Sequence, residues 1–299
     1  MIQALRSAFA LPDLRRKILF TLFILSLYRV AAHIPVPGVN QQALQDLFAS
    51  STGVGALANI INLLSGGAVS NFSVLAMGVY PYITAQIILQ LLVGVIPALE
   101  RMMKEEGSAG RKKIETYTYI LTVPMAMLSA ISQVRIFSSS GAEIIPGFLA
   151  EGNFLPSLSV ILTMTAGTFF AIWLGELITE QGIGQGLSII IFGGIVARLP
   201  QNVAELLADP NRAALSLLAF VIIIVAIVLV IVVVQEGQRR IPVQYGKRVR
   251  GRKVYGGGST HIPLKVNMAG MIPLIFAQSI LVLPAIIAQI FAGSPDPGV

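Results

Sequence analysis

The 299-residue sequence contains no cysteine, and its only histidines are His33 and His261. A chain without thiols forms neither disulfides nor thiolate metal sites. The histidines are not part of a metal-ligand pattern such as H-E-x-x-H, so we expect no metal and no other cofactor. The sequence also lacks a G-x-S-x-G elbow and a G-x-x-x-x-G-K-[ST] loop, which argues against a serine hydrolase and a nucleotide-driven motor. These absences predict a protein that is not an enzyme.

Charge is scarce as well. Charged residues make up 12% of the chain and hydrophobic residues 55%, and the mean hydropathy is +0.79. This composition is typical of a chain whose solvent is mostly lipid. A helix crosses the ~30 Å hydrocarbon core with about 20 mostly apolar residues. The intervals of this kind predict an all-α polytopic membrane protein with seven transmembrane helices, at about 18–34, 72–97, 114–136, 154–174, 184–200, 213–234 and 266–292.

The basic residues are distributed unevenly between these spans. Seventeen of the 21 Lys and Arg residues fall in three clusters that bound the apolar runs. Because cytoplasmic loops of membrane proteins carry the Lys and Arg excess, the three clusters and the amino terminus are predicted to be cytoplasmic. The clusters are Arg6, Arg15, Arg16 and Lys17; Arg101, Lys104, Arg111, Lys112 and Lys113; and Arg239, Arg240, Lys247, Arg248, Arg250, Arg252, Lys253 and Lys265.

Two apolar intervals are not ordinary spans. An odd number of crossings is required between His33 and Glu100, so the short run 54–64, followed by Ser-Gly-Gly, is predicted not to cross. We expect a short helix that enters from outside and turns back beside protein or a water-filled cavity, with a loop on the outer leaflet as the alternative. The fifth span is short and begins with several glycines, which favours a transport pathway, although glycine also permits close helix packing.

Polar stripes mark the second and seventh spans. Val79, Ile83, Gln86 and Gln90 share one helical face in the second span, and Asn267, Met271, Ile275 and Gln278 repeat the arrangement in the seventh. Because primary amides are costly in hydrocarbon, both faces are predicted to look at protein or water. Because the two spans carry similar stripes, we favour the interpretation that they form facing walls of one cavity. The alternative is that the amides only form hydrogen bonds between helices.

The third basic cluster occupies a long loop, residues 235–265, in which Val, Ile and Tyr alternate with polar residues. This alternation predicts a projecting hairpin. Topology needs only a few cations, and the surplus favours binding of an acidic protein or ribosomal RNA; a topology signal alone is the other interpretation. The predicted partner-binding residues are Arg239, Arg240, Lys247, Arg248, Arg250, Arg252 and Lys253.

The residues also bear on two other classes of membrane protein. A seven-helix receptor would carry a lysine deep in its last helix, whereas Lys265 lies at the mouth of the seventh span. An ion-coupled secondary transporter with broken helices is the stronger alternative. Against it, the spans offer no carboxylate for a coupling ion.

Several stretches resemble a known family over essentially the whole chain. They are Ile34–Gly38, Phe72–Ile83, Trp173–Glu176, Gly182–Gly186, Ser188–Phe192 and Ser259–Gly270. Together they resemble the SecY family, the channel-forming subunits of the bacterial protein translocon. The resemblance implies a ten-span channel fold built as two inverted halves of five. Residues 1–200 would form the first half. Residues 201–299 would form an incomplete second half, so the resemblance implies a fragment or a truncated reading frame.

The resemblance also implies roles for particular residues. A waist of aliphatic side chains, the pore ring, would include Val79, Ile83, Ile191 and Ile275. A plug helix at about 55–67 would close the outer side, and its residues would include Gly55, Ile60, Ile61, Asn62, Leu63, Gly66 and Gly67. A lateral gate between the second and seventh spans would use Gln86, Gln90, Asn267 and Gln278.

The function implied is passage of unfolded secretory polypeptides across the bacterial cytoplasmic membrane and release of membrane proteins into it. The implied partners are SecE-like and SecG-like small membrane subunits, the SecA motor ATPase, the ribosome, a signal sequence and the lipid bilayer. The basic loop would receive the ribosome or SecA, and the motor would supply the energy.

Overall fold

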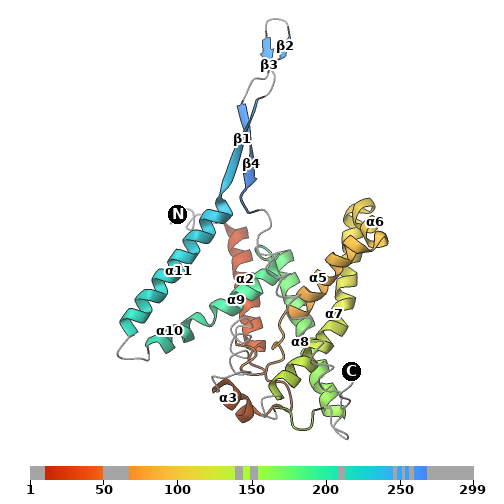
Figure 1. Ribbon diagram of the computed structural model, residues 1–299, viewed down its shortest axis with the longest axis vertical. Helices are drawn as coiled ribbons and strands as arrows, with labels where there is room; N and C mark the ends of the chain where they lie inside the picture. Colours follow the sequence, from red (N-terminus) through yellow and green to blue (C-terminus); the bar gives the residue numbers. More distant parts are fainter. Residues whose placement is uncertain are drawn as a thin grey trace, which may run out of the picture. The chain divides into compact units, whose positions relative to one another are not determined.

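The computed structural model describes residues 11–49, 67–138, 144–148, 154–207, 213–244, 248–250, 253–255 and 259–267. Figure 1 shows a mostly helical chain with one β-hairpin. The chain divides into two compact units between Pro200 and Gln201. The first contains the described residues up to Pro200, and the second contains those from Gln201 to Asn267.

Helices build the first unit. They are α2 (Pro12–Ala31), α3 (Gln41–Ala49), α5 (Tyr80–Val95), α6 (Pro97–Glu105), α7 (Gly107–Ser138), α8 (Phe154–Gln181) and α9 (Gly186–Val196), and α10 (Leu199–Leu207) lies across the division. Helix α5 packs on α7, α7 packs on α8, and α8 packs on α9, while α2 contacts both α8 and α9.

Three helices in the described part of the chain are long and apolar enough to cross a membrane. They are α7, α8 and the Leu217–Glu236 part of α11. Helices α7 and α8 contain the predicted spans 114–136 and 154–174, and Leu217–Glu236 covers most of the predicted span 213–234. Helices α5 and α6 could form a fourth span together, although they bend by 96° where they meet. The prediction of a multi-pass, mostly helical membrane protein is confirmed at this level.

The predicted boundaries of the other spans were less accurate. The span at 72–97 was wrong at its start, because residues 67–79 form turns and α5 begins only at Tyr80. Gly78 has a φ of +52°, and Pro81 lies in the first turn of α5, where a proline starts a helix rather than continuing one. Helix α2 covers 12–31 rather than 18–34, and α9 covers 186–196 of the predicted 184–200.

The second unit contains α11 (Ala213–Glu236) and a long hairpin of β1 (Gln238–Gln244), β2 (Arg248–Arg250), β3 (Lys253–Tyr255) and β4 (Ser259–Lys265). Strand β1 pairs antiparallel with β4, and β2 with β3. The projecting hairpin is therefore confirmed, and the all-α fold class is corrected to a helical protein with a β-hairpin. Of the seventh predicted span, only Val266 and Asn267 lie among the described residues, and neither is helical.

The register of the hairpin accommodates two prolines. Pro242 lies opposite His261, and Pro263 lies opposite Arg240, two positions further along the ladder. Cross-strand pairs alternate between those that exchange backbone hydrogen bonds and those that do not. The pairs that contain Pro242 and Pro263 are two steps apart, so they are of the same kind. Both prolines can therefore lie in pairs that exchange no backbone hydrogen bonds, where no N–H is needed.

The core of the first unit consists of two hydrophobic clusters, with residues 67–79 contributing to both. Val69, Phe72 and Met77 belong to the first cluster, which includes residues of α7 and α8. Leu75 and Val79 belong to the second, which includes residues of α2, α8 and α9. The non-helical segment before α5 is thus buried between the clusters.

Candidate functional site

The turn segment 67–79, which carries part of the Phe72–Ile83 motif, pairs with the Ile34–Gly38 motif. The N–H of Val36 donates to the carbonyl of Phe72 at 3.0 Å, and the N–H of Val74 donates to the carbonyl of Ile34 at 3.0 Å. An isolated antiparallel bridge joins Pro35 to Ser73 between them. Two motifs that lie far apart in the sequence therefore form one structural unit at the start of α5.

Three of the four predicted pore-ring residues pack against the second cluster. Val79 immediately precedes α5 and is 5% exposed. Ile83, one turn later, and Ile191, on α9, are half-buried and pack against the same cluster. The fourth residue, Ile275, lies outside the described residues. The first unit therefore brings aliphatic side chains from two helices, remote in sequence, into one region.

The predicted gate amides have different environments. Gln86 on α5 is half-buried, and Gln90 at the end of the same stripe is exposed. Asn267 is half-buried at the end of the described part of the second unit, and Gln278 lies outside the described residues. The gate remains a prediction.

Of the predicted plug residues, only Gly67 is described; Gly55, Ile60, Ile61, Asn62, Leu63 and Gly66 lie outside the described residues. Gly67 has a φ of +94°, a backbone conformation that favours glycine. The side chain of Arg198, in the turn after α9, lies directly against it. Sequence reasoning did not single out Arg198, although it is the only charged residue between Glu180 and Glu205.

The glycine-rich motif between α8 and α9 forms a tight reversal. The N–H of Gly186 donates to Thr179 Oγ1 at 2.9 Å, and that hydroxyl donates to the carbonyl of Gly175 at 3.0 Å. A Cβ at Gly186 would overlap the backbone of Gly175. The glycines thus let α9 begin against the side of α8, which sets the position of Ile191 five residues later.

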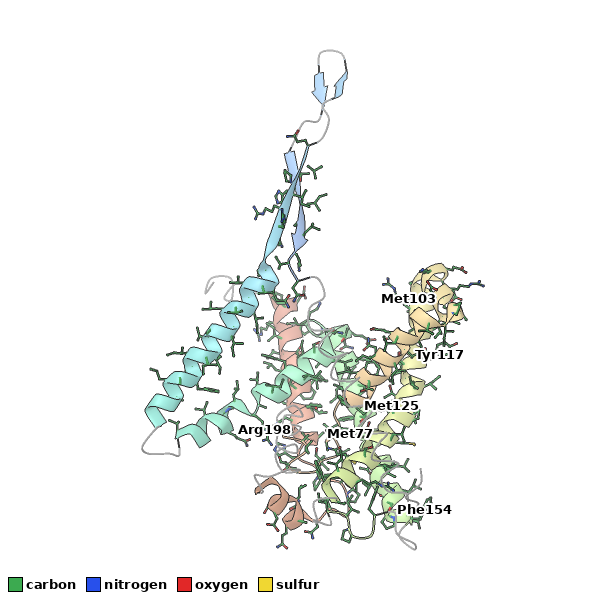
Figure 2. All side chains as sticks on the ribbon, in the orientation of Figure 1. Met77, Met103, Tyr117, Met125, Phe154 and Arg198 are labelled. Atoms are coloured by element: carbon green, nitrogen blue, oxygen red, sulfur yellow. The ribbon has the colours of Figure 1, made fainter. Side chains whose placement is uncertain are left out.

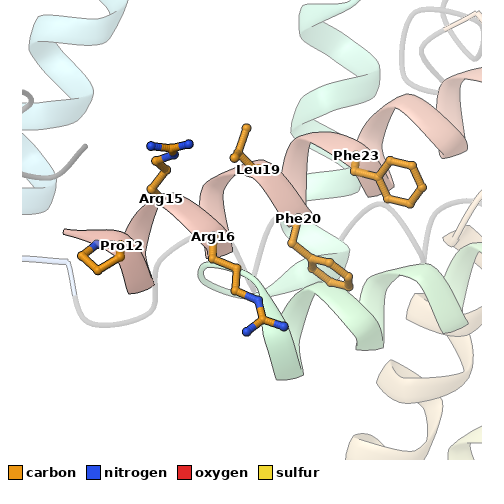
Figure 3. Close-up of a pocket in the computed structure, with 6 residues that line it drawn as sticks. All are labelled: Pro12, Arg15, Arg16, Leu19, Phe20 and Phe23. Atoms are coloured by element: carbon orange, nitrogen blue, oxygen red, sulfur yellow. The ribbon is translucent and has the colours of Figure 1, made fainter. Parts of the chain in front are cut away.

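Two surface grooves accompany these elements. One, of about 530 Å³, is lined by Leu27 of α2, Val74 of the turn segment and Phe170 of α8, among others. The other, of about 550 Å³, follows α2 alone, and Figure 3 shows Arg15 and Arg16 before the rings of Phe20 and Phe23. Cations followed by large apolar residues are expected where a helix enters a bilayer from its cytoplasmic surface.

Similarity to known proteins decides the family. A SecY family profile matches residues 73–298. The protein translocase subunit SecY of Streptomyces galbus is 44% identical to this chain, over 98% of the chain and 68% of that protein. The corresponding protein of Mycobacterium tuberculosis strain H37Rv is 45% identical, over 97% of the chain and 66% of that protein. The chain belongs to the SecY family.

Solved structures show that the SecY family fold is present. A protein conducting channel aligns with a TM-score of 0.58 at 21% identity and covers 92% of this chain. A channel in the canine ribosome–channel complex from the endoplasmic reticulum aligns with a TM-score of 0.57 at 19% identity. The chain spans 58% of each of these proteins and about two thirds of its SecY relatives.

The hairpin of this SecY-family chain differs electrostatically from the α6–α7 region. There, Lys104 pairs with Glu100 at 2.6 Å and Lys113 pairs with Glu106 at 2.7 Å. From Gly237 to Lys265, by contrast, the sequence has eight Lys and Arg residues and no acidic residue. Arg239 and Arg240 are exposed on β1, and Arg250 lies opposite Lys253 in the register of β2 and β3.

Proposed function

We propose that this chain is part of a channel that conducts unfolded secretory polypeptides across the bacterial cytoplasmic membrane and releases membrane proteins into it. The channel itself carries out no covalent chemistry. The observation that carries the proposal is the match to SecY relatives along nearly the whole chain. The packing of Val79, Ile83 and Ile191 around one apolar cluster supports it.

An aliphatic waist suits this task for two reasons. A narrow hydrophobic constriction dewets when it is empty, which blocks ions. Aliphatic side chains also offer no hydrogen bonds to a sliding polypeptide, so the chain meets little specific resistance. In the proposed ring, Ile275 of the seventh span joins Val79, Ile83 and Ile191.

Besides the ring, the proposed channel has a plug and a lateral gate, both of which would move. Residues 55–67 would form the plug that closes the outer side. The second and seventh spans would separate at a lateral gate, where Gln86 and Gln90 would face Asn267 and Gln278. A signal sequence would leave through this gate into lipid, and amides at the seam would offer weak polar contacts that are easily exchanged.

The chain would cross the membrane seven times with its amino terminus in the cytoplasm. Residues 1–200 would form one five-helix half, and residues 201–299 would begin an inverted second half. SecE-like and SecG-like membrane subunits would brace the channel. Helix α11 suits a lipid-facing position, because none of its apolar window is buried among the described residues.

The hairpin would be the docking element for the ribosome or the SecA motor. Like charges directly opposite one another destabilise a two-stranded ladder, and Arg250 lies opposite Lys253. The sequence from Gly237 to Lys265 has no acidic residue to relieve this repulsion, whereas an anionic partner would relieve it. Phosphate or carboxylate groups of the partner would bind the arginines through paired hydrogen bonds.

Crosslinking tests the channel proposal. A secretory chain is stalled during export in membranes that contain the protein and its partner subunits, with a single cysteine introduced by Ile83→Cys or Ile191→Cys. Because the natural sequence has no cysteine, every thiol adduct reports the introduced position. We expect adducts with the stalled chain at both positions.

The matched control is Ile120→Cys on α7, where the isoleucine is 62% exposed on a different helix. It should give no adduct. Absence of adducts at both ring positions, or equal crosslinking at position 120, would contradict the channel. Uptake of a small solute driven by an ion gradient, measured in vesicles, would favour the secondary transporter instead.

A further inference from the structure

Arg198 connects two parts of the first unit that are remote in the sequence. It lies in the turn between α9 and α10, at the carboxyl end of α9 (Figure 2). Its guanidinium Nη2 donates a hydrogen bond to Ser70 Oγ at 2.8 Å, across 128 sequence positions. In the proposed topology, this end of the fifth span lies on the outer side of the membrane.

The contact extends from Ser70 to the backbone of Gly67. Ser70 Oγ donates to the carbonyl of Gly67 at 2.8 Å while it accepts from Arg198. A Cβ at Gly67 would lie 2.6 Å from both Nε and Nη2 of Arg198. A side chain at this position would push the guanidinium aside, and only glycine adopts a φ of +94° without strain. The backbone conformation therefore requires glycine, and the missing side chain lets the guanidinium approach.

The residues that follow Gly67 are firmly held. Ala68 and Val69 are fully buried, and they belong to different hydrophobic clusters. The N–H of Ser73 donates to the carbonyl of Ala68 at 2.9 Å, and the N–H of Phe72 donates to that of Val69 at 2.9 Å. The guanidinium therefore binds at the boundary where the proposed plug ends and the buried segment begins.

We propose that Arg198 is a positioning residue that fastens the Gly67–Ser70 segment to the carboxyl end of α9. Movement of the fifth span would then be transmitted to the end of the plug, and loss of the contact would favour the released plug. The link to gating rests on the proposed function, whereas the attachment itself does not. An arginine in an otherwise uncharged stretch suits this role because a charge-assisted hydrogen bond is stronger than a neutral one.

Thiol accessibility tests the attachment. Ala68→Cys places the only thiol of the chain at a fully buried position beside the contact. We expect Arg198→Ala to increase the rate at which a membrane-impermeant maleimide modifies the cysteine at position 68 by about tenfold. This increase corresponds to a loss of about 1.4 kcal/mol in the free energy that keeps the segment closed. Arg198→Lys, which keeps the charge but loses the planar fork, should give an intermediate rate. Ser70→Ala should give an increase close to that of Arg198→Ala.

Two controls separate this effect from general unfolding. Arg135→Ala removes a cation from the last turn of α7 and should leave the rate at position 68 unchanged. Ala130→Cys, fully buried on α7, should react equally slowly with and without Arg198→Ala. Unchanged reactivity at position 68 in Arg198→Ala would overturn the attachment, and so would a parallel rise at position 130.

Ion leak through vesicles containing the protein and its partner subunits tests the consequence for gating. Arg198→Ala should increase the leak, and Arg135→Ala should not. Faster modification at position 68 without any added leak would overturn the gating role while leaving the attachment in place. Failure of the proposed function would be seen separately, as missing polypeptide adducts at Ile83 and Ile191.

Discussion

Phe72 shows at the scale of one residue how the fold holds a strained conformation. It has a φ of +42°, which is unfavourable for a residue with a Cβ. Its side chain is fully buried, and its ring meets that of Phe137 edge-on, with centroids 6.0 Å apart. Its backbone donates to Val69 and accepts from Val36. These contacts together stabilise the strained backbone conformation by more than it costs, so the strain persists in the folded protein.

This strain predicts an unusual order of stabilities. Phe72→Ala should lower the free energy of unfolding by about 3–5 kcal/mol, because it empties a buried site. Phe72→Gly loses the same ring but also releases the strain, so it should be the more stable of the two by about 1 kcal/mol. Denaturant unfolding of the purified protein, followed by circular dichroism, measures both variants.

The same pair of substitutions at Met164 provides the control. Met164 is equally buried but lies in the interior of helix α8, where glycine is less stable than alanine by about 1 kcal/mol. Met164→Gly should therefore unfold more easily than Met164→Ala. The same order at both positions would show that Phe72 carries no backbone strain.

At the scale of elements, the sequence predicted best where local pattern alone decides the structure. The apolar runs of α7, α8 and α11 and the alternation in the hairpin were enough to place these elements. The start of α5 was predicted wrongly because residues 72–79 are as apolar as a helix. Their conformation depends instead on hydrogen bonds with the segment after α2. Tertiary pairing of this kind has no periodic signal in the sequence.

The hairpin is an element in which stability and binding are expected to oppose one another. Arg250 and Lys253 face each other in its register, so Lys253→Glu replaces a repulsive pair with an attractive one. The same change removes a cation from the proposed docking surface and adds an anion. The hairpin should become better ordered while the affinity for ribosomes at low salt falls about tenfold or more.

Cosedimentation with purified ribosomes measures the affinity of the hairpin variants. Lys265→Glu is the control, because it makes the same charge change at the base of the hairpin, opposite the neutral Gln238. A smaller loss of binding is expected there. Equal losses for the two variants would mean that total charge, rather than the end of the hairpin around β2 and β3, determines ribosome binding.

At the scale of the whole molecule, the residues of the proposed site could be predicted only in part. Periodicity placed Val79 and Ile83 on one face, but Ile191 entered through the family resemblance, because a single isoleucine in an apolar run is not distinctive. Arg198 was missed because its partners, Gly67 and Ser70, lie 128 or more positions away. A lone cation in an uncharged stretch was the only available signal.

The proposed topology can be tested with single cysteines, since the natural chain has none. Gln42 is exposed on α3, Ser108 is exposed at the start of α7, and Thr260 is exposed on β4. The distribution of Lys and Arg places position 42 outside and positions 108 and 260 inside. In right-side-out vesicles, an impermeant maleimide should therefore label Gln42→Cys but neither Ser108→Cys nor Thr260→Cys.

All three cysteines should react once the vesicles are permeabilised, which shows that each is accessible. Positions 108 and 260 are separated by the four proposed spans of α7, α8, α9 and α11, so an even count requires them to behave alike. Labelling of position 260 without position 108 would show that the two positions lie on opposite sides of the membrane, so that one of the four proposed spans does not cross. The short α9, with only 11 helical residues, would then be the span that fails to cross, and the docking hairpin would face away from the cytoplasm.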